Sequence, residues 1–93
     1  MATVIFRVTP TDYEAWYEGH SGQVENMKNA SVTSDTIYRD RSDGKSIVLV
    51  QQVDDVDKMM AFFNSPELQK AIAESPIEAP PEMWILDEVE RVF

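Results

Sequence analysis

Alternating apolar and polar positions predict four strands in this chain. Thr3–Val8 (TVIFRV) is β-branched and aromatic except for Arg7, which is typical of a strand covered on both faces. Lys45–Val53 (KSIVLVQQV) has the strongest strand pattern and is expected to be central. Val32–Asp40 (VTSDTIYRD) alternates weakly and predicts an edge strand, and Met83–Phe93 (MWILDEVERVF) predicts a long final strand.

A first helix is predicted within Thr9–Asn29. At 3.6 residues per turn, one arc of about 100° carries six side chains: Tyr13, Trp16, Tyr17, His20, Val24 and Met27. Gly19 and Gly22 lie on the opposite side of the helix and permit a kink there.

The start of this helix has two candidate caps. Thr9 can be the N-cap with Pro10 at the first helical position. Thr11 with Glu14 offers the same capping pattern two residues later.

A second helix is predicted to begin after a cap at Asp54 or Asp55, and to restart at Ser65, where Ser65 can cap and Pro66 takes the first helical position. Three prolines exclude regular structure from the loop between residues 75 and 82. The apolar face of the second helix consists of Val56, Met59, Met60, Phe63, Leu68 and Ile72.

The resulting order, βαββαβ, predicts an α+β fold of the ferredoxin-like type. We expect a four-stranded, antiparallel-dominated sheet with two helices on one face. The length of 93 residues is that of one small domain, residues 1–93.

The face of the sheet away from the helices is predicted to pair with a second copy. Ile5 lies on that face, and the last strand carries apolar residues at both parities, whereas a solvated face alternates more cleanly. The simplest cover is another copy of the same sheet, which predicts a face-to-face homodimer. Arg7 would then need a partner, for which the candidates are Gln52, Asp87 and Glu88.

Charge and composition narrow the function classes. With 17 acidic and 8 basic residues the net charge is −9, which repels nucleic-acid backbones and anionic lipid surfaces. The chain has no cysteine, and its longest uninterrupted apolar run is far shorter than a membrane span. The N-terminus lacks the features of a signal peptide, so we expect a cytoplasmic protein.

His20 is the main candidate for chemistry, because its side chain titrates near neutral pH and points among aromatic residues. The alternative is a core or rim histidine with no catalytic role. A partner that orients the ring must come from the sheet or the second helix, and Asn64 is one candidate.

Aromatic and sulfur-containing side chains can line a pocket for a planar, apolar ligand. The alternative is ordinary core packing, which is favoured for Trp16, whereas Tyr17 and Trp84 stay open. The predicted ligand-binding residues are Tyr13, Trp16, Met59, Phe63 and Trp84.

The sequence contains no motif for a metal, a nucleotide or a nucleophile. One histidine, no cysteine and no calcium-loop or zinc-helix motif argue against a metal site. No G-x-S-x-G or glycine-rich phosphate loop is present either. We therefore predict no cofactor.

Three segments and the closing Pro-Pro-Glu-Met-Trp resemble the dimeric α/β-barrel superfamily, which includes antibiotic-biosynthesis-monooxygenase-like proteins. The segments are Asp12–His20 (DYEAWYEGH), Tyr38–Asp40 (YRD) and Phe63–Leu68 (FNSPEL), and the likeness covers nearly the whole chain. The superfamily includes cofactor-independent oxygenases, haem enzymes, isomerases and many small proteins. Its haem-degrading members use a histidine on the second helix, and residues 55–74 contain none here.

The resemblance implies a pocket between helices and sheet, and three functions follow. The first is binding of a small aromatic or polyketide-like compound beside His20. The second is cofactor-independent oxygenation or isomerisation in that pocket, with His20 as acid/base and with Tyr17 and Asn64 polarising a carbonyl. The third is a non-catalytic dimerisation or stress-associated module with a filled core.

Overall fold

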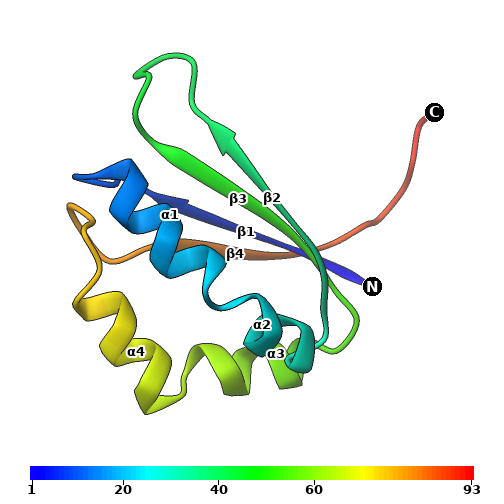
Figure 1. Cartoon of the computed structure of the whole chain (residues 1–93). Helices are drawn as coiled ribbons and strands as arrows, with labels where there is room; N and C mark the ends of the chain where they lie inside the picture. Colours follow the sequence, from blue (N-terminus) through cyan, green and yellow to red (C-terminus); the bar gives the residue numbers. More distant parts are fainter.

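Four antiparallel strands form one sheet in the computed structural model of all 93 residues. The strand order is β2-β3-β1-β4, so the α+β ferredoxin-like fold predicted from the sequence is confirmed (Figure 1). The strands are β1 (Ala2–Val8), β2 (Val32–Arg39), β3 (Ile47–Val53) and β4 (Glu82–Asp87).

The helices all lie on one side of the sheet, and each predicted helix is divided into two (Figure 1). The second helix restarts as predicted: the Asp55 side chain caps α3, and the Ser65 side chain caps α4 with Pro66 in its first turn. The four helices are α1 (Tyr13–Ser21), α2 (Val24–Asn29), α3 (Val56–Phe63) and α4 (Pro66–Ala73).

The start of α1 differs from both predicted caps. Asp12 is the N-cap, and its carboxylate accepts a hydrogen bond from the Ala15 amide at 3.2 Å. Thr9 cannot cap the helix, because its carbonyl, which would accept the first intrahelical bond, is bound to the loop before β4. The Thr11 backbone is bound to the same loop through its amide. The Thr11 amide donates to the Pro76 carbonyl at 2.8 Å, and the Glu78 amide donates to the Thr9 carbonyl at 2.9 Å.

The break between α1 and α2 occurs at Gly22, one of the two glycines expected to permit a kink. Gly22 ends α1, and its amide donates to the Glu18 carbonyl at 3.1 Å. A Cβ atom at this position would lie 3.4 Å from that carbonyl oxygen, an ordinary van der Waals distance, and the backbone is right-handed, so neither feature requires glycine. The break redirects the chain and lets α2 pack beside β2.

The core lies between the helices and one face of β1 and β3. Burial alternates strictly along both strands, and Val4, Ile47 and Val53 are fully buried. The helices add Trp16 from α1, and α2 and α3 each add one buried methionine. Only 14 of 93 residues are buried, so the core is thin for the length of chain.

The opposite face of the sheet carries an uncovered strip of apolar side chains. Ile5 on β1 pairs with Val50 on β3 and with Trp84 on β4, so the three lie side by side on this face. Tyr38, Trp84 and Leu86 are between 44% and 54% exposed. The clean polar alternation of a solvated face is absent, as the sequence predicted.

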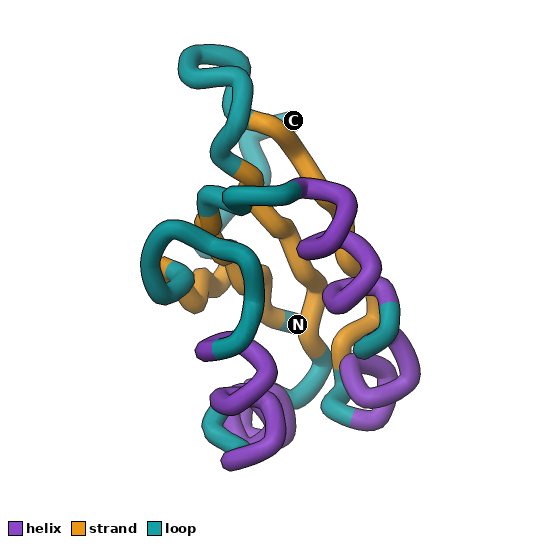
Figure 2. The backbone as a smooth tube through the Cα atoms, turned by 60° about the vertical axis from the view of Figure 1, so that its left-hand side comes forward, coloured by secondary structure: helices purple, strands orange, loops and turns teal.

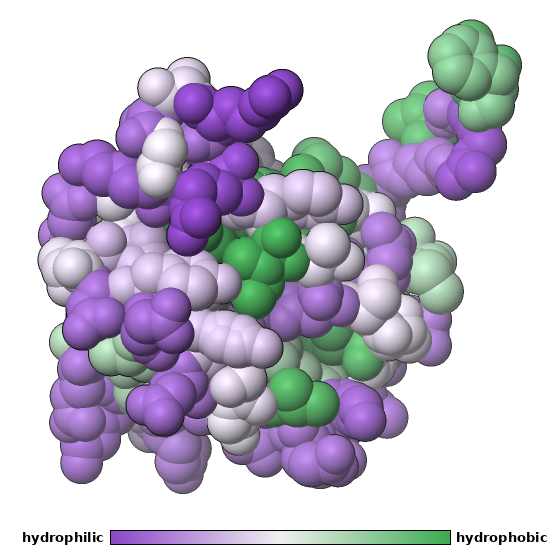
Figure 3. Space-filling view, turned by 45° about the horizontal axis from the view of Figure 1, so that its top comes forward, coloured by the Kyte–Doolittle hydropathy of each residue, from purple (hydrophilic) through white to green (hydrophobic).

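The final strand is shorter than predicted. It ends at Asp87, and residues 88–93 have no regular structure and project from the body with exposed hydrophobic side chains (Figures 1 and 3). The physical reason is the register: Asp87 pairs with Ala2, the first residue of β1. Beyond that point, β1 offers no further backbone partner.

Arg7 pairs with the β2–β3 turn instead of the predicted Gln52, Asp87 or Glu88. Its guanidinium lies 3.1 Å from Asp40 and 3.5 Å from Asp43. The register explains the difference, because Arg7 lies opposite Val48 and Glu82, near the end of β1 that meets this turn. The predicted partners lie at or beyond the other end of the sheet.

The turn should weaken in acid. Hydrogen bonds from Ser46 and two backbone amides lower the pKa of Asp43 from 3.8 to about 2, and bonds from Ser42 and then Arg7 lower the pKa of Asp40. Because the folded-state pKa lies below the ordinary one, this stabilisation is complete above the ordinary pKa and is lost as the pH falls through about 2. Urea unfolding of Asp43→Asn should therefore depend less on pH between about 4 and 2 than unfolding of the parent protein. Glu90→Gln, in the projecting segment, should leave the slope unchanged, and equal slopes for all three proteins would contradict the assignment.

Candidate functional site

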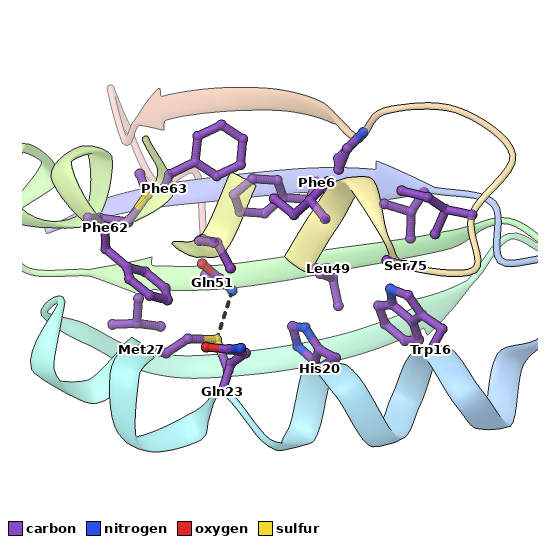
Figure 4. Close-up of a pocket in the computed structure, with 17 residues that line it drawn as sticks. Phe6, Trp16, His20, Gln23, Met27, Leu49, Gln51, Phe62, Phe63 and Ser75 are labelled. Atoms are coloured by element: carbon purple, nitrogen blue, oxygen red, sulfur yellow. Dashed lines mark hydrogen bonds between the residues drawn. The ribbon is translucent and has the colours of Figure 1, made fainter. Parts of the chain in front are cut away.

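A cavity of about 120 Å³ lies between the sheet and the helices (Figure 4). Twelve of its 17 lining residues are hydrophobic, and they come from the three strands β1–β3, all four helices and the loop before β4. The lining includes Phe6, Trp16, His20, Gln23, Met27, Leu49, Gln51, Met59, Phe62, Phe63, Ile72 and Ser75. An engineered apolar cavity of about 150 Å³ holds a benzene molecule, so this space suits a single small ring.

Four of the predicted site residues meet in this cavity. His20 and Trp16 reach it from α1, and Met59 and Phe63 reach it from α3. Trp16 and Met59 are also buried core residues, so they serve packing and lining together.

The other four predicted site residues lie outside the cavity. Tyr13 stacks on Tyr17 with ring centroids 6.1 Å apart, and Tyr17 is 41% exposed. Asn64 is an exposed residue at the C-terminal end of α3. Trp84 lies on the opposite face of the sheet, beside Ile5. The structure therefore does not bring these side chains together with His20.

His20 is held by Asp35, a partner that the sequence analysis did not identify. The ring nitrogen Nε2 lies 2.6 Å from the Asp35 carboxylate, and the ring stacks on Trp16 with centroids 5.0 Å apart and planes at 11°. The side chains of His20 and Asp35 are only 16% and 19% exposed. An ionised carboxylate only accepts hydrogen bonds, so Nε2 carries the proton, and in neutral His20 the lone pair lies on Nδ1.

Asp35 is fixed in turn by Gln51. The Gln51 amide donates to the second Asp35 oxygen at 3.2 Å and lies 3.6 Å from the sulfur of Met27. Asp35 and Gln51 pair across β2 and β3, on the face that also carries Ile37 and Leu49. Gln51 falls in the inward row of β3, which is the one signal that the sequence offers, whereas the inward position of Asp35 depends on the register irregularity between Val32 and Ser34.

The polar groups His20 and Gln23 lie on the α1–α2 side of the cavity, with Met27 and Trp16 beside them (Figure 4). Phe6 and Phe63 lie across the space from them. The two phenylalanine rings pack with centroids 5.6 Å apart. Such a space favours a ring with one polar substituent, placed toward His20.

Nothing in the structure adds a metal centre or a membrane span. No group of three or more His, Asp or Glu side chains is placed to hold a metal ion. None of the helices has the length and apolar character needed to cross a bilayer.

The fold defines the chain as an α+β protein of the type found in the antibiotic biosynthesis monooxygenases. No protein-family model and no curated protein sequence matches the chain. Solved structures do match along nearly its whole length. The resemblance to the dimeric α/β-barrel superfamily is thereby confirmed at the level of the fold.

Two solved structures illustrate the match. A candidate antibiotic biosynthesis monooxygenase from Bordetella bronchiseptica has a TM-score of 0.78 and 16% identity, covering 96% of this chain and 97% of its own. SnoaB, a cofactor-independent oxygenase from Streptomyces nogalater, has a TM-score of 0.76 and 14% identity, covering 98% and 95%. At such identities the likeness establishes the fold alone.

The tautomer of His20 provides a direct test of the Asp35 contact. Above neutral pH, nitrogen-15 NMR of the ring should show the proton on Nε2, because Asp35 accepts it there. Asp35→Ala should remove that preference, whereas Asp57→Ala, on the exposed start of α3, should not. A ring with its proton on Nδ1 in the parent protein would contradict the contact.

Proposed function

We propose that this protein binds a small, planar, apolar molecule that carries one hydroxyl or carbonyl group, in the cavity beside His20. The observation that carries the proposal is the cavity itself, with the oriented His20 in an otherwise largely apolar wall. The ring of the ligand would contact Phe6 and Phe63, and its polar group would meet His20 and Gln23.

Two further observations support a ligand over a filled core. The space leaves apolar side chains of the core without packing partners on one side, and a bound ligand would supply those contacts. The polar side chains in the lining also need an explanation, because a purely structural cavity gains nothing from an inward-facing histidine and glutamine.

A matched pair of ligands tests the proposal. Phenol and benzene share a ring, but only phenol can donate a hydrogen bond to Nδ1 of His20. Both should bind, with phenol about fivefold tighter, since one net hydrogen bond contributes about 1 kcal/mol. Ile72→Phe places a larger side chain in the cavity and should raise both dissociation constants by at least about tenfold, measured by NMR titration.

The control for this variant is the same change on an exposed strand position. Ile85→Phe lies on β4 outside the cavity lining and should leave both affinities unchanged. If neither ligand binds the parent protein at millimolar concentration, the proposal is wrong, and the non-catalytic dimerisation or stress-associated module becomes the better account.

A second candidate function, acid/base catalysis in the same cavity, is favoured by the short His20–Asp35 contact. Nδ1 can take a proton from a bound hydroxyl group or from a carbon beside a carbonyl, and Asp35 then stabilises the charged ring. Returning the proton to a different carbon isomerises the ligand. Alternatively, the electron-rich anion adds O₂ and takes back the proton to form a hydroperoxide, which loses water to leave a new carbonyl group. Gln23 lines the cavity and can donate to a carbonyl, whereas Tyr17 and Asn64 lie outside it.

Turnover separates the binder from the enzyme. Oxygen uptake and deuterium exchange in D₂O, measured on a panel of phenols and small ketones, should both be lost in His20→Gln if the cavity is an active site. Binding without either reaction in the parent protein supports the binder.

We also propose a homodimer formed through the free faces of two sheets. The surface that supports it is contiguous and apolar, with Ile5, Val50 and Trp84 paired side by side across three strands. Large exposed apolar patches on small proteins mark interaction sites, and a self-complementary pairing of sheets is the simplest cover.

Val50→Glu should separate this dimer, because it places an unpaired carboxylate at the centre of the contact. Sedimentation at micromolar concentration should show twice the chain mass of 10.6 kDa for the parent protein and a single chain for the variant. Ala61→Glu adds the same charge on the exposed side of α3 and should stay dimeric. A parent protein that sediments at 10.6 kDa refutes the dimer.

A further inference from the structure

A groove at the surface between α1 and α4 adjoins the cavity. This groove is lined by Ala15, Gly19, Ala71, Glu74 and Pro76, together with residues that also line the cavity. The shared residues are Trp16, His20, Gln23, Leu68, Ile72 and Ser75. The groove and the cavity therefore meet along a common wall.

The arrangement of the helices leaves this groove uncovered. Close backbone contacts join α2 to α3 and α3 to α4, whereas α1 and α4 are not packed together to the same extent. The helix turns fall into two separate groups on one side of the sheet (Figure 2). His20 is in contact with both spaces and lies where the groove reaches the cavity.

Gly19 lines this groove, and neither its backbone conformation nor a neighbouring segment requires glycine. It lies within the regular part of α1, and its backbone conformation does not require glycine. A Cβ atom there would meet nothing within 4 Å, so no close approach of another segment requires glycine either. A small side chain would therefore fit at this position, and only a large one would extend into the groove.

We propose that the groove between α1 and α4 is the entrance through which the ligand reaches the cavity, with Gly19 and Ala71 at its rim. This assignment rests on the proposed function, because an entrance needs a cavity that takes up a ligand. The entrance lies in the helix layer, on the side away from the free face of the sheet, so pairing of two sheets leaves it accessible.

The test is the exchange rate of a fluorinated probe. 4-Fluorophenol binding is followed by fluorine-19 NMR, which gives the association and dissociation rates as well as their ratio. Gly19→Trp should slow both rates by at least about tenfold and change the dissociation constant by less than about threefold, since a block in the passage affects both directions. Gly19→Ala should exchange as fast as the parent protein and unfold at a higher urea concentration.

Two further variants make the result decisive. Glu18→Trp adds the same side chain on the neighbouring exposed position, outside the groove, and should leave the rates unchanged. Ala71→Trp narrows the entrance from the α4 side and should slow exchange as Gly19→Trp does, which also covers the case in which one variant does not fold. Binding with unaltered rates in both groove variants overturns the entrance alone. Failure of the parent protein to bind the probe overturns the proposed function as well.

Discussion

Burial of one face of β1 and β3 under the helices is the interaction on which the rest of this structure depends. Val4, Ile47 and Val53 are fully buried there, but only 14 of the 93 residues are buried in all. The space of about 120 Å³ beside this core leaves its lining side chains with fewer packing partners, at a cost in free energy that is smaller than for a sealed cavity because the space opens to solvent. Domains are typically stable by only about 5–15 kcal/mol, so such a cost matters for a thin core. A bound ligand that fills the space would recover part of that free energy.

The His20–Asp35 pair is a second cost that packing alone does not explain. Asp35 and Gln51 take positions on the inward face of the sheet, in the same rows as the apolar Ile37 and Leu49. Apolar side chains of similar size would pack there without desolvating a charge, and replacing buried polar pairs in that way is often neutral or stabilising. The pair is instead fully connected, since Gln51 holds Asp35, Asp35 holds His20, and Trp16 fixes the ring plane. A polar chain of this kind restricts one imidazole to one orientation at the cavity wall.

Local patterns predicted the elements and their faces, whereas contacts between elements needed the folded chain. The alternation in β1 and β3 is a property of each strand, so the buried face, the order of elements and the restart of the second helix at Ser65 were all predictable. Asp12 replaced Thr9 as the cap because a distant loop binds the Thr9 backbone. The end of β4 is set by where β1 begins, which the sequence of β4 does not contain.

The same distinction holds for the candidate site, where local patterns predicted some residues and contacts between elements determined the others. His20 was identifiable as the one histidine of the chain, on an aromatic helix face, and Trp16, Met59 and Phe63 follow from helical spacing. The role of Asp35 depends on the register between β2 and β3, and on an irregularity near Val32 and Ser34 that sets which residues face inward. Trp84 has strand parity that places it on the other face of the sheet.

The net charge of the chain restricts the charge of the ligand. Neither the cavity nor the His20–Asp35 pair does so by itself. A chain with a charge of −9, and with Glu74 at the proposed entrance, repels anions before they reach the helix layer. A phenol or an enolisable carbonyl compound is neutral in water at neutral pH and passes this field unhindered. Within the proposed site the polar group of that molecule would face His20, whose ring Asp35 orients. The charge of the chain thus disfavours anionic ligands, in agreement with the proposed neutral phenol or carbonyl compound.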